Sequence, residues 1–169
     1  MKYFLCSMLA LLLLYACNTD AAGGKGKAVK SGSAAPAQAA GDSPEEKLLM
    51  NNFWVIEYYI SFKDFEGGKA NRGRWYRFKP DGTFANGHWG EQTGYGTWRL
   101  LYKDGDNAAF VIDSATDDTE DAGWEIQQKS PSGDEMTWVG IKDYATVYGD
   151  LVKAINLLTA PTKKQFGDE

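Results

Sequence analysis

The stretch GRWYRFKPDGTFANGHWG, from Gly73 to Gly90, decides the fold. It contains two strand-like segments, Arg74 to Lys79 and Thr83 to Trp89, joined by the turn sequence Pro80-Asp81-Gly82. The stretch therefore predicts two adjacent antiparallel strands. It also holds the only histidine of the chain, His88, and is rich in aromatic residues. Such a hairpin could form the wall of a binding site or simply close an ordinary core.

Further strands and turns continue on both sides of this hairpin. The predicted strands are residues 53–62, 74–79, 83–89, 95–103, 108–113, 123–129 and 134–142. Strands joined by short turns without helical crossovers form an antiparallel meander, and closure hides its edges. We therefore predict an all-β, up-and-down, eight-stranded antiparallel barrel. Residues 144–158 fit either a helical stripe or the eighth, closing strand, and we favour the strand.

The predicted barrel domain spans residues 43–161, begins with a short helix, and is flanked by a linker and a tail. Ser43, Pro44 and Glu46 have the pattern of a capping box and predict a short N-terminal helix. Residues 17–42 are mostly Ala, Gly, Ser and Lys and predict a disordered linker. Residues 162–169 are polar and predict a flexible tail.

The N-terminus predicts export from the cytoplasm. The apolar run Phe4 to Leu14 is shorter than the roughly 20 residues of a membrane span, but it suits a signal peptide over residues 1–16. It ends at Leu14-Tyr15-Ala16-Cys17, which resembles the lipobox of bacterial lipoproteins. The resemblance implies that Cys17 is lipidated and anchors the chain in the cell envelope. Asn18 implies the outer membrane, on its periplasmic face or at the cell surface. The alternative is a secreted protein whose signal is cut elsewhere.

The region from Leu48 to Pro161 is similar to the small lipocalin-like domains found on bacterial lipoproteins. The residues that carry the resemblance are Trp54, Trp75-Tyr76-Arg77-Phe78, Asp81-Gly82-Thr83-Phe84 and Gly94-Tyr95-Gly96-Thr97-Trp98. The resemblance implies an up-and-down barrel in which a small ligand can bind.

Strand alternation predicts which side chains face the barrel interior. They are Trp54, Ile56, Tyr58, Ile60, Tyr76, Phe78, Phe84, Trp98, Leu100, Phe110, Ile112, Trp124, Ile126, Met136 and Trp138. Asn86 and His88 share this inward side near a barrel mouth, unless a bulge near Gly87 reverses them. Arg74 and Gln128 could add hydrogen-bond donors at the same end. The candidate ligand-binding residues are Asn86, His88, Trp54, Tyr58, Tyr76, Trp98, Trp124 and Trp138.

Three functions are compatible with this pattern. The first is a membrane-anchored barrel that binds a small, mostly apolar ligand in the envelope. The alternative is a filled barrel that acts in protein interaction or assembly, with the outward Trp75, Trp89 and Tyr95 contacting an envelope protein or a glycan. The third is a hydrolase, but the predicted domain contains one histidine and no cysteine. The predicted domain therefore lacks the residues that catalytic sites based on histidine and cysteine require. We predict no enzyme and no cofactor.

The charge of the chain excludes one class of partner and weighs against a metal. A net charge of −5 argues against nucleic acid, whose phosphates require a clustered basic face. Five carboxylates gather between residues 113 and 121. Because this segment lacks the alternation and the central glycine of a calcium loop, it predicts a solvated acidic loop and no metal site.

Overall fold

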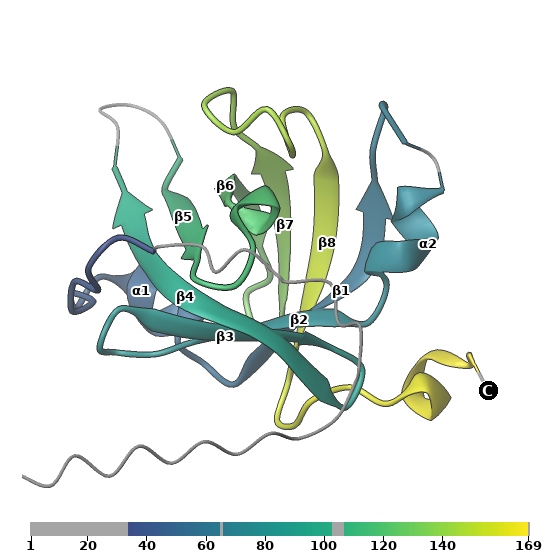
Figure 1. Cartoon of the computed structure of the whole chain (residues 1–169). Coiled ribbons are helices and arrows are strands. Elements are labelled where there is room, and N and C mark those ends of the chain that lie inside the picture. Colours follow the sequence, from purple (N-terminus) through teal and green to yellow (C-terminus); the bar gives the residue numbers. More distant parts are fainter. Residues whose placement is uncertain (1–33, 65, 103–106, 169) are drawn as a thin grey trace, which may run out of the picture.

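The computed structural model describes residues 34–64, 66–102 and 107–168, and most of these residues lie in or between β-strands (Figure 1). The predicted signal peptide, Cys17 and the linker up to residue 33 lie outside the described residues. Among the helices in these ranges, none has the length and apolar character needed to cross a membrane.

Eight strands form one closed antiparallel ring, because each strand pairs with the next and β8 pairs back with β1. The strands are β1 (Phe53–Ile60), β2 (Arg74–Phe78), β3 (Thr83–His88), β4 (Glu91–Leu101), β5 (Ala109–Ser114), β6 (Ala122–Lys129), β7 (Glu135–Gly140) and β8 (Leu151–Leu157). The all-β, antiparallel prediction is confirmed. The last strand confirms that the closing part of residues 144–158 is extended.

A short helix, α1 (Pro44–Leu49), precedes β1 and covers one end of the ring. Its predicted capping box is confirmed, since the Ser43 hydroxyl accepts from the Glu46 N–H at 3.1 Å. The indole Nε1 of Trp54 donates to the carbonyls of Leu48 and Leu49 at 3.2 and 3.1 Å. We call this the closed end. The opposite end, where β1 finishes and β2 begins, is called the far end.

The interior of the ring is filled with apolar side chains. The buried members of this core are Leu49, Trp54, Ile56, Tyr76, Phe78, Phe84, Trp98, Phe110, Ile112, Ala122, Trp124, Ile126, Met136, Trp138, Val152 and Ala154. The Trp138 ring lies between 5.0 and 6.5 Å, centroid to centroid, from the rings of Trp54, Tyr76, Phe110 and Trp124. Side-chain contacts thus extend across the centre of the ring.

Two residues predicted inside the barrel, Tyr58 and Ile60, face outward instead. The pairing of β1 with β8 shifts between Ile56 and Tyr58, so Glu57 is an extra residue in β1. Such a bulge reverses the alternation that follows it. Tyr58 and Ile60 are consequently 60% and 46% exposed, whereas Tyr59 turns inward and places its ring 6.2 Å from that of Trp124.

A second, smaller core lies on the outer face of the ring, around Trp75. Trp75 points outward as predicted, yet it is only 4% exposed, because it packs with Val55 and Ala85 beneath the C-terminal segment. That segment, predicted as a flexible tail, forms a 3-10 helix, η2 (Lys163–Phe166), and Phe166 packs against this cluster. The tail residues therefore cover the Trp75 side chain, which strand alternation alone predicted to be exposed on the outer face.

The described end of the predicted linker also contacts the ring. The Ala40 N–H donates to the Pro80 carbonyl in the β2–β3 turn at 2.9 Å, and the Ala40 side chain packs against the main core.

A second short helix, α2 (Gly67–Asn71), follows β1 and appears on the opposite side of the view from α1 (Figure 1).

Candidate functional site

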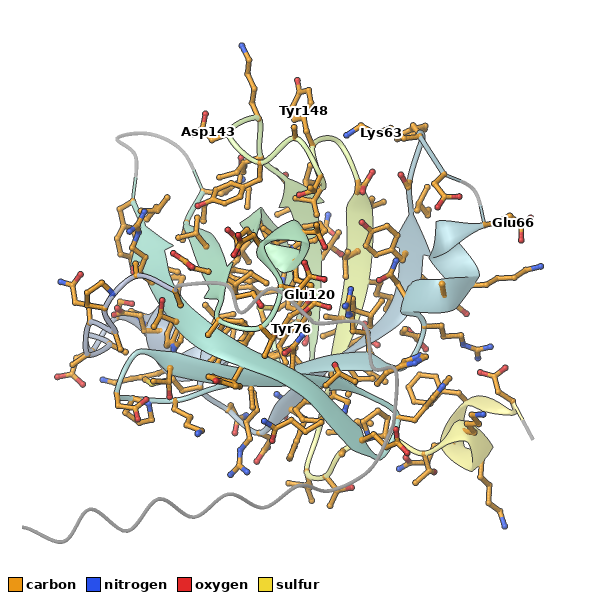
Figure 2. The ribbon with its side chains drawn as sticks, in the orientation of Figure 1. Lys63, Glu66, Tyr76, Glu120, Asp143 and Tyr148 are labelled. Carbon is orange, nitrogen blue, oxygen red and sulfur yellow. The ribbon has the colours of Figure 1, made fainter. Side chains whose placement is uncertain are left out.

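Polar side chains gather at the far end of the ring. Arg74 begins β2, Asn86 lies near the end of β3, and Glu120 ends the 3-10 helix η1 (Asp118–Glu120), which connects β5 to β6. The Arg74 Nη2 donates to Glu120 Oε1, and the Asn86 Nδ2 donates to Glu120 Oε2 at 2.9 Å. In Figure 2, Glu120 appears directly above Tyr76, the next inward residue of β2. We call Arg74, Tyr76, Asn86 and Glu120 the far-end cluster.

The strand register explains why three of these residues meet. Tyr76 pairs with Asn86 across β2 and β3, and Arg74 pairs with His88 one inward position closer to the far end. Side chains two residues apart on a strand share a face, so Arg74 and Tyr76 both lie on the inner side.

The connection between β5 and β6 brings the fourth residue, Glu120, to the same place. The Ser114 hydroxyl accepts from the N–H groups of Thr116 and Asp117 at 3.3 and 3.2 Å. The Asp117 carboxylate in turn accepts from the Thr119 N–H at 2.9 Å. These local bonds fold the connection into a turn that directs Glu120 toward the ring.

Several buried polar atoms inside the ring have no partner among the residues that the structure describes. Asn86 is 1% exposed, and its Oδ1 accepts no hydrogen bond from the residues that the structure describes. The same holds for the buried Nε1 atoms of Trp124 and Trp138. Leaving a buried donor or acceptor unpaired costs about 1–3 kcal/mol. Native structures therefore usually pair such groups, with protein or with another molecule.

A second polar pair, Tyr59 and Asp150, lies beside the far-end cluster. The Tyr59 hydroxyl donates to Asp150 Oδ2 at 2.6 Å, and Asp150 is buried just before β8. Burial, and then the bond to Asp150, raise the pKa of Tyr59 well above its usual range. Burial likewise raises the pKa of Tyr76.

Because of these raised pKa values, we expect stability to fall at alkaline pH. The unfolded chain loses its tyrosine protons above about pH 10, before Tyr59 does in the folded chain, so stability present below that pH is lost as the pH rises. In Tyr59→Phe, the free energy of unfolding should decline less steeply between about pH 10 and 12, as measured by urea unfolding. Tyr58→Phe, at the exposed neighbouring position, controls for the loss of one hydroxyl. An unchanged slope in Tyr59→Phe would contradict the expectation.

The remaining predicted site residues are distributed over the ring. The Trp98 Nε1 donates to the Lys79 carbonyl at 3.0 Å, so Trp98, like Trp54, has its N–H bonded toward the closed end. His88 is half-buried on the rim of the far end, with Nε2 2.8 Å from the Arg72 carbonyl oxygen. Tyr58 lies outside the ring, for the reason given above.

Of the eight candidates, Tyr76 and Asn86 are paired on adjacent strands at the far end, and Trp138 contacts the rings of Tyr76 and Trp124 in the core. Arg74 lies at the far end as expected, whereas Gln128 lies near the opposite end of β6 from η1 and is exposed. Sequence reasoning missed Tyr59, Asp150 and Glu120. The only signal for Glu120 was its place in the acidic segment.

The far end presents donors that suit an anionic oxygen ligand. Arginine and amide N–H groups bind carboxylate and phosphate oxygens, and bonds to a charged acceptor are the stronger ones. Here two such donors, on adjacent strands, converge on one carboxylate group.

No family model, curated protein or solved structure matches the chain.

Proposed function

We propose that the chain is an envelope lipoprotein with a lipocalin-like barrel that binds a small, mostly apolar ligand at its far end. The observation that carries this proposal is that two polar atoms among the buried rings, Asn86 Oδ1 and Trp124 Nε1, have no partner in the described part of the chain. Ligand sites are typically lined by apolar and aromatic groups with a few polar atoms that fix orientation. The far end combines both.

The packed centre of the ring limits how deep such a ligand can sit. Trp138 contacts four other rings, so a ligand in the middle would have to displace several large side chains. At the far end the covering element is instead the short connection between β5 and β6, residues 115–121. The proposed ligand therefore lies beneath this connection, against the rings of Tyr76 and Trp124.

Native mass spectrometry of the purified full-length chain tests the proposal. We expect a small molecule that co-purifies with the wild-type chain and is lost from Asn86→Leu, which removes the buried amide at similar volume. Gln92→Leu removes an amide from an exposed position of β4 and should retain the molecule. A ligand-free mass, together with an unchanged melting temperature across a panel of fatty acids and alcohols, would exclude ligand binding.

The proposed anchor yields a separate prediction. Replacing Cys17 with serine should move the protein from the membrane fraction to the soluble fraction, because the lipid acyl chains are attached through this thiol and stable anchoring requires them. Cys6→Ser is the matched control, since Cys6 lies in the predicted signal peptide and is removed with it. Fractionation and immunoblotting measure both. A Cys17→Ser protein that stays in the membrane fraction would contradict lipid anchoring.

A second candidate function, a filled barrel that contacts an envelope protein, is favoured by an exposed stripe that runs from the end of β1 into the segment after it. Tyr58, Ile60 and Phe62 are all exposed, Phe62 by 75%. This stripe differs from the aromatic set expected for that function, because Trp75 is buried and the Trp89 ring packs at 5.5 Å from Phe166. A ligand-free result in the experiment above would favour this candidate.

A further inference from the structure

We propose that Glu120 occupies the place of a ligand carboxylate, and that the ligand is a small organic carboxylate that displaces it from Arg74 and Asn86. The inference rests on the proposed function, since it names the ligand class and the regulation of the same site. Glu120 then acts as a tethered competitor that holds the far end closed until the ligand binds.

The Glu120 carboxylate is held as a bound carboxylate ligand would be. Its two oxygens are bonded separately, Oε1 by the Arg74 guanidinium and Oε2 by the Asn86 amide. Both donors belong to adjacent strands of the ring, whereas the acceptor belongs to a connection outside the strands. A free carboxylate would be bound by the same two groups in the same way. We call Arg74 and Asn86 the receptor. In this structure the receptor binds Glu120, which belongs to the β5–β6 connection.

The amide that binds Glu120 is buried inside the ring. Asn86 is almost completely buried, so its amide satisfies its hydrogen-bonding capacity only through groups that enter the ring. One side of the amide meets Glu120, while its Oδ1 has no partner in the described chain. A surface ion pair would not require a buried amide. The Asn86 side chain is therefore placed to recognise a polar group from within the ring.

Glu120 can leave Arg74 and Asn86 without disturbing the strands of the ring. It is carried by a 3-10 helix of three residues, within a segment that has five carboxylates between residues 113 and 121. Like charges so close together repel one another, and the neighbouring acids Asp113, Asp118 and Asp117 help burial to raise the pKa of Asp121. Release of the connection into solvent relieves this repulsion, and a ligand carboxylate replaces the ion pair with Arg74.

The rest of the ligand would meet aromatic side chains. Tyr76, which pairs with Asn86, lies 6.2 Å from Phe84, ring to ring, and Trp124 belongs to the same buried core. These surfaces suit a short apolar body behind the carboxylate. Trp124 also offers an indole N–H that has no partner among the described residues.

Calorimetric titration of hexanoate into the purified full-length chain tests the inference. Glu120→Ala removes the tethered competitor, so it should bind hexanoate about tenfold more tightly than wild type, because affinity scales with the fraction of open receptor. Glu91→Ala removes the same charge from an exposed position at the start of β4, outside the acidic segment, and should bind as wild type does. The double variant Glu120→Ala, Arg74→Ala should lose binding. Glu120→Gln, which keeps the side-chain volume, should give an intermediate gain and serves if Glu120→Ala does not fold.

The possible outcomes separate the inference from the proposed function. Equal hexanoate affinity in wild type and Glu120→Ala would overturn the role of Glu120. If 1-hexanol or hexyl phosphate binds Glu120→Ala as tightly as hexanoate, the far-end site stands and the carboxylate class is wrong. If no probe binds any variant, the inference fails. The proposed function then also fails, unless native mass spectrometry shows a bound molecule.

Discussion

Replacing Trp138 with alanine should lower the free energy of unfolding by about 3–5 kcal/mol, the cost typical of removing a buried Trp or Phe. Trp138 has no exposed surface, and its ring contacts four others across the centre of the closed ring. Truncation removes all of these contacts at once and leaves a cavity that the strands cannot close. Urea unfolding followed by far-UV circular dichroism measures the effect.

Two further variants make this result specific. Trp138→Phe keeps an aromatic ring and removes the unpartnered N–H, so it should cost clearly less than Trp138→Ala. Phe62→Ala, at a 75% exposed position, should change the free energy of unfolding by no more than about 0.5 kcal/mol. If Trp138→Ala cost less than about 1 kcal/mol, the interior could not be the packed core described above.

Replacing Trp75 with alanine should lower the free energy of unfolding by about 3 kcal/mol, although Trp75 lies outside the ring. Its ring stands edge-on to that of Phe53 at 5.2 Å, and its Nε1 donates to the Trp89 carbonyl at 2.7 Å. The mutation therefore removes buried area, an aromatic pair and a hydrogen bond together. Thermal and urea unfolding report the loss.

Tyr95→Ala is the matched control for Trp75, because Tyr95 is an outward aromatic residue that is 56% exposed. This variant should remain within about 0.5 kcal/mol of wild type. Should Trp75→Ala prove as mild as Tyr95→Ala, the outer core would be wrong. Trp75 would then belong to the exposed aromatic set expected of an interaction protein.

The sequence predicted those parts of the fold that depend on neighbouring residues. In the turn Pro80-Asp81-Gly82, Gly82 has a φ of +78°, which glycine adopts readily. The Asp81 carboxylate there accepts from the Thr83 N–H at 2.9 Å. Both features are local, so the hairpin was predictable. Alternation then placed Tyr76, Phe78 and Phe84 in the core, where the structure has them.

Features that depend on distant pairing were not predictable in the same way. The extra residue Glu57 in β1 is defined only by the register against β8, about a hundred residues later in the chain. Without that register, strict alternation placed Tyr58 inside and Tyr59 outside. Likewise, nothing local to Trp75 indicates that Phe166 covers it.

Of the candidate site, the position of Asn86 was predictable from the sequence and that of Glu120 was not. The inward direction of Asn86 followed from the strand pattern, and the structure places Asn86 in the ring. Its partner Glu120 lies 34 residues further along the chain, in a segment whose composition indicates only a solvated acidic loop. The closure of that segment onto Arg74 is a tertiary contact without a sequence signature.

The most direct test of a ligand site at the far end follows the tryptophan indole N–H signals by two-dimensional ¹H–¹⁵N NMR. Hexanoate and 1-hexanol are each titrated into the labelled full-length chain, with signals assigned from single Trp→Phe variants. The N–H groups of Trp124 and Trp138 have no protein partner in the described chain, whereas those of Trp54 and Trp98 are bonded to carbonyls.

A far-end ligand predicts that the Trp124 signal shifts progressively while those of Trp54 and Trp98 stay in place. If neither probe moves the Trp124 signal, or if Trp54 and Trp98 shift as much as Trp124 does, the site at the far end is contradicted.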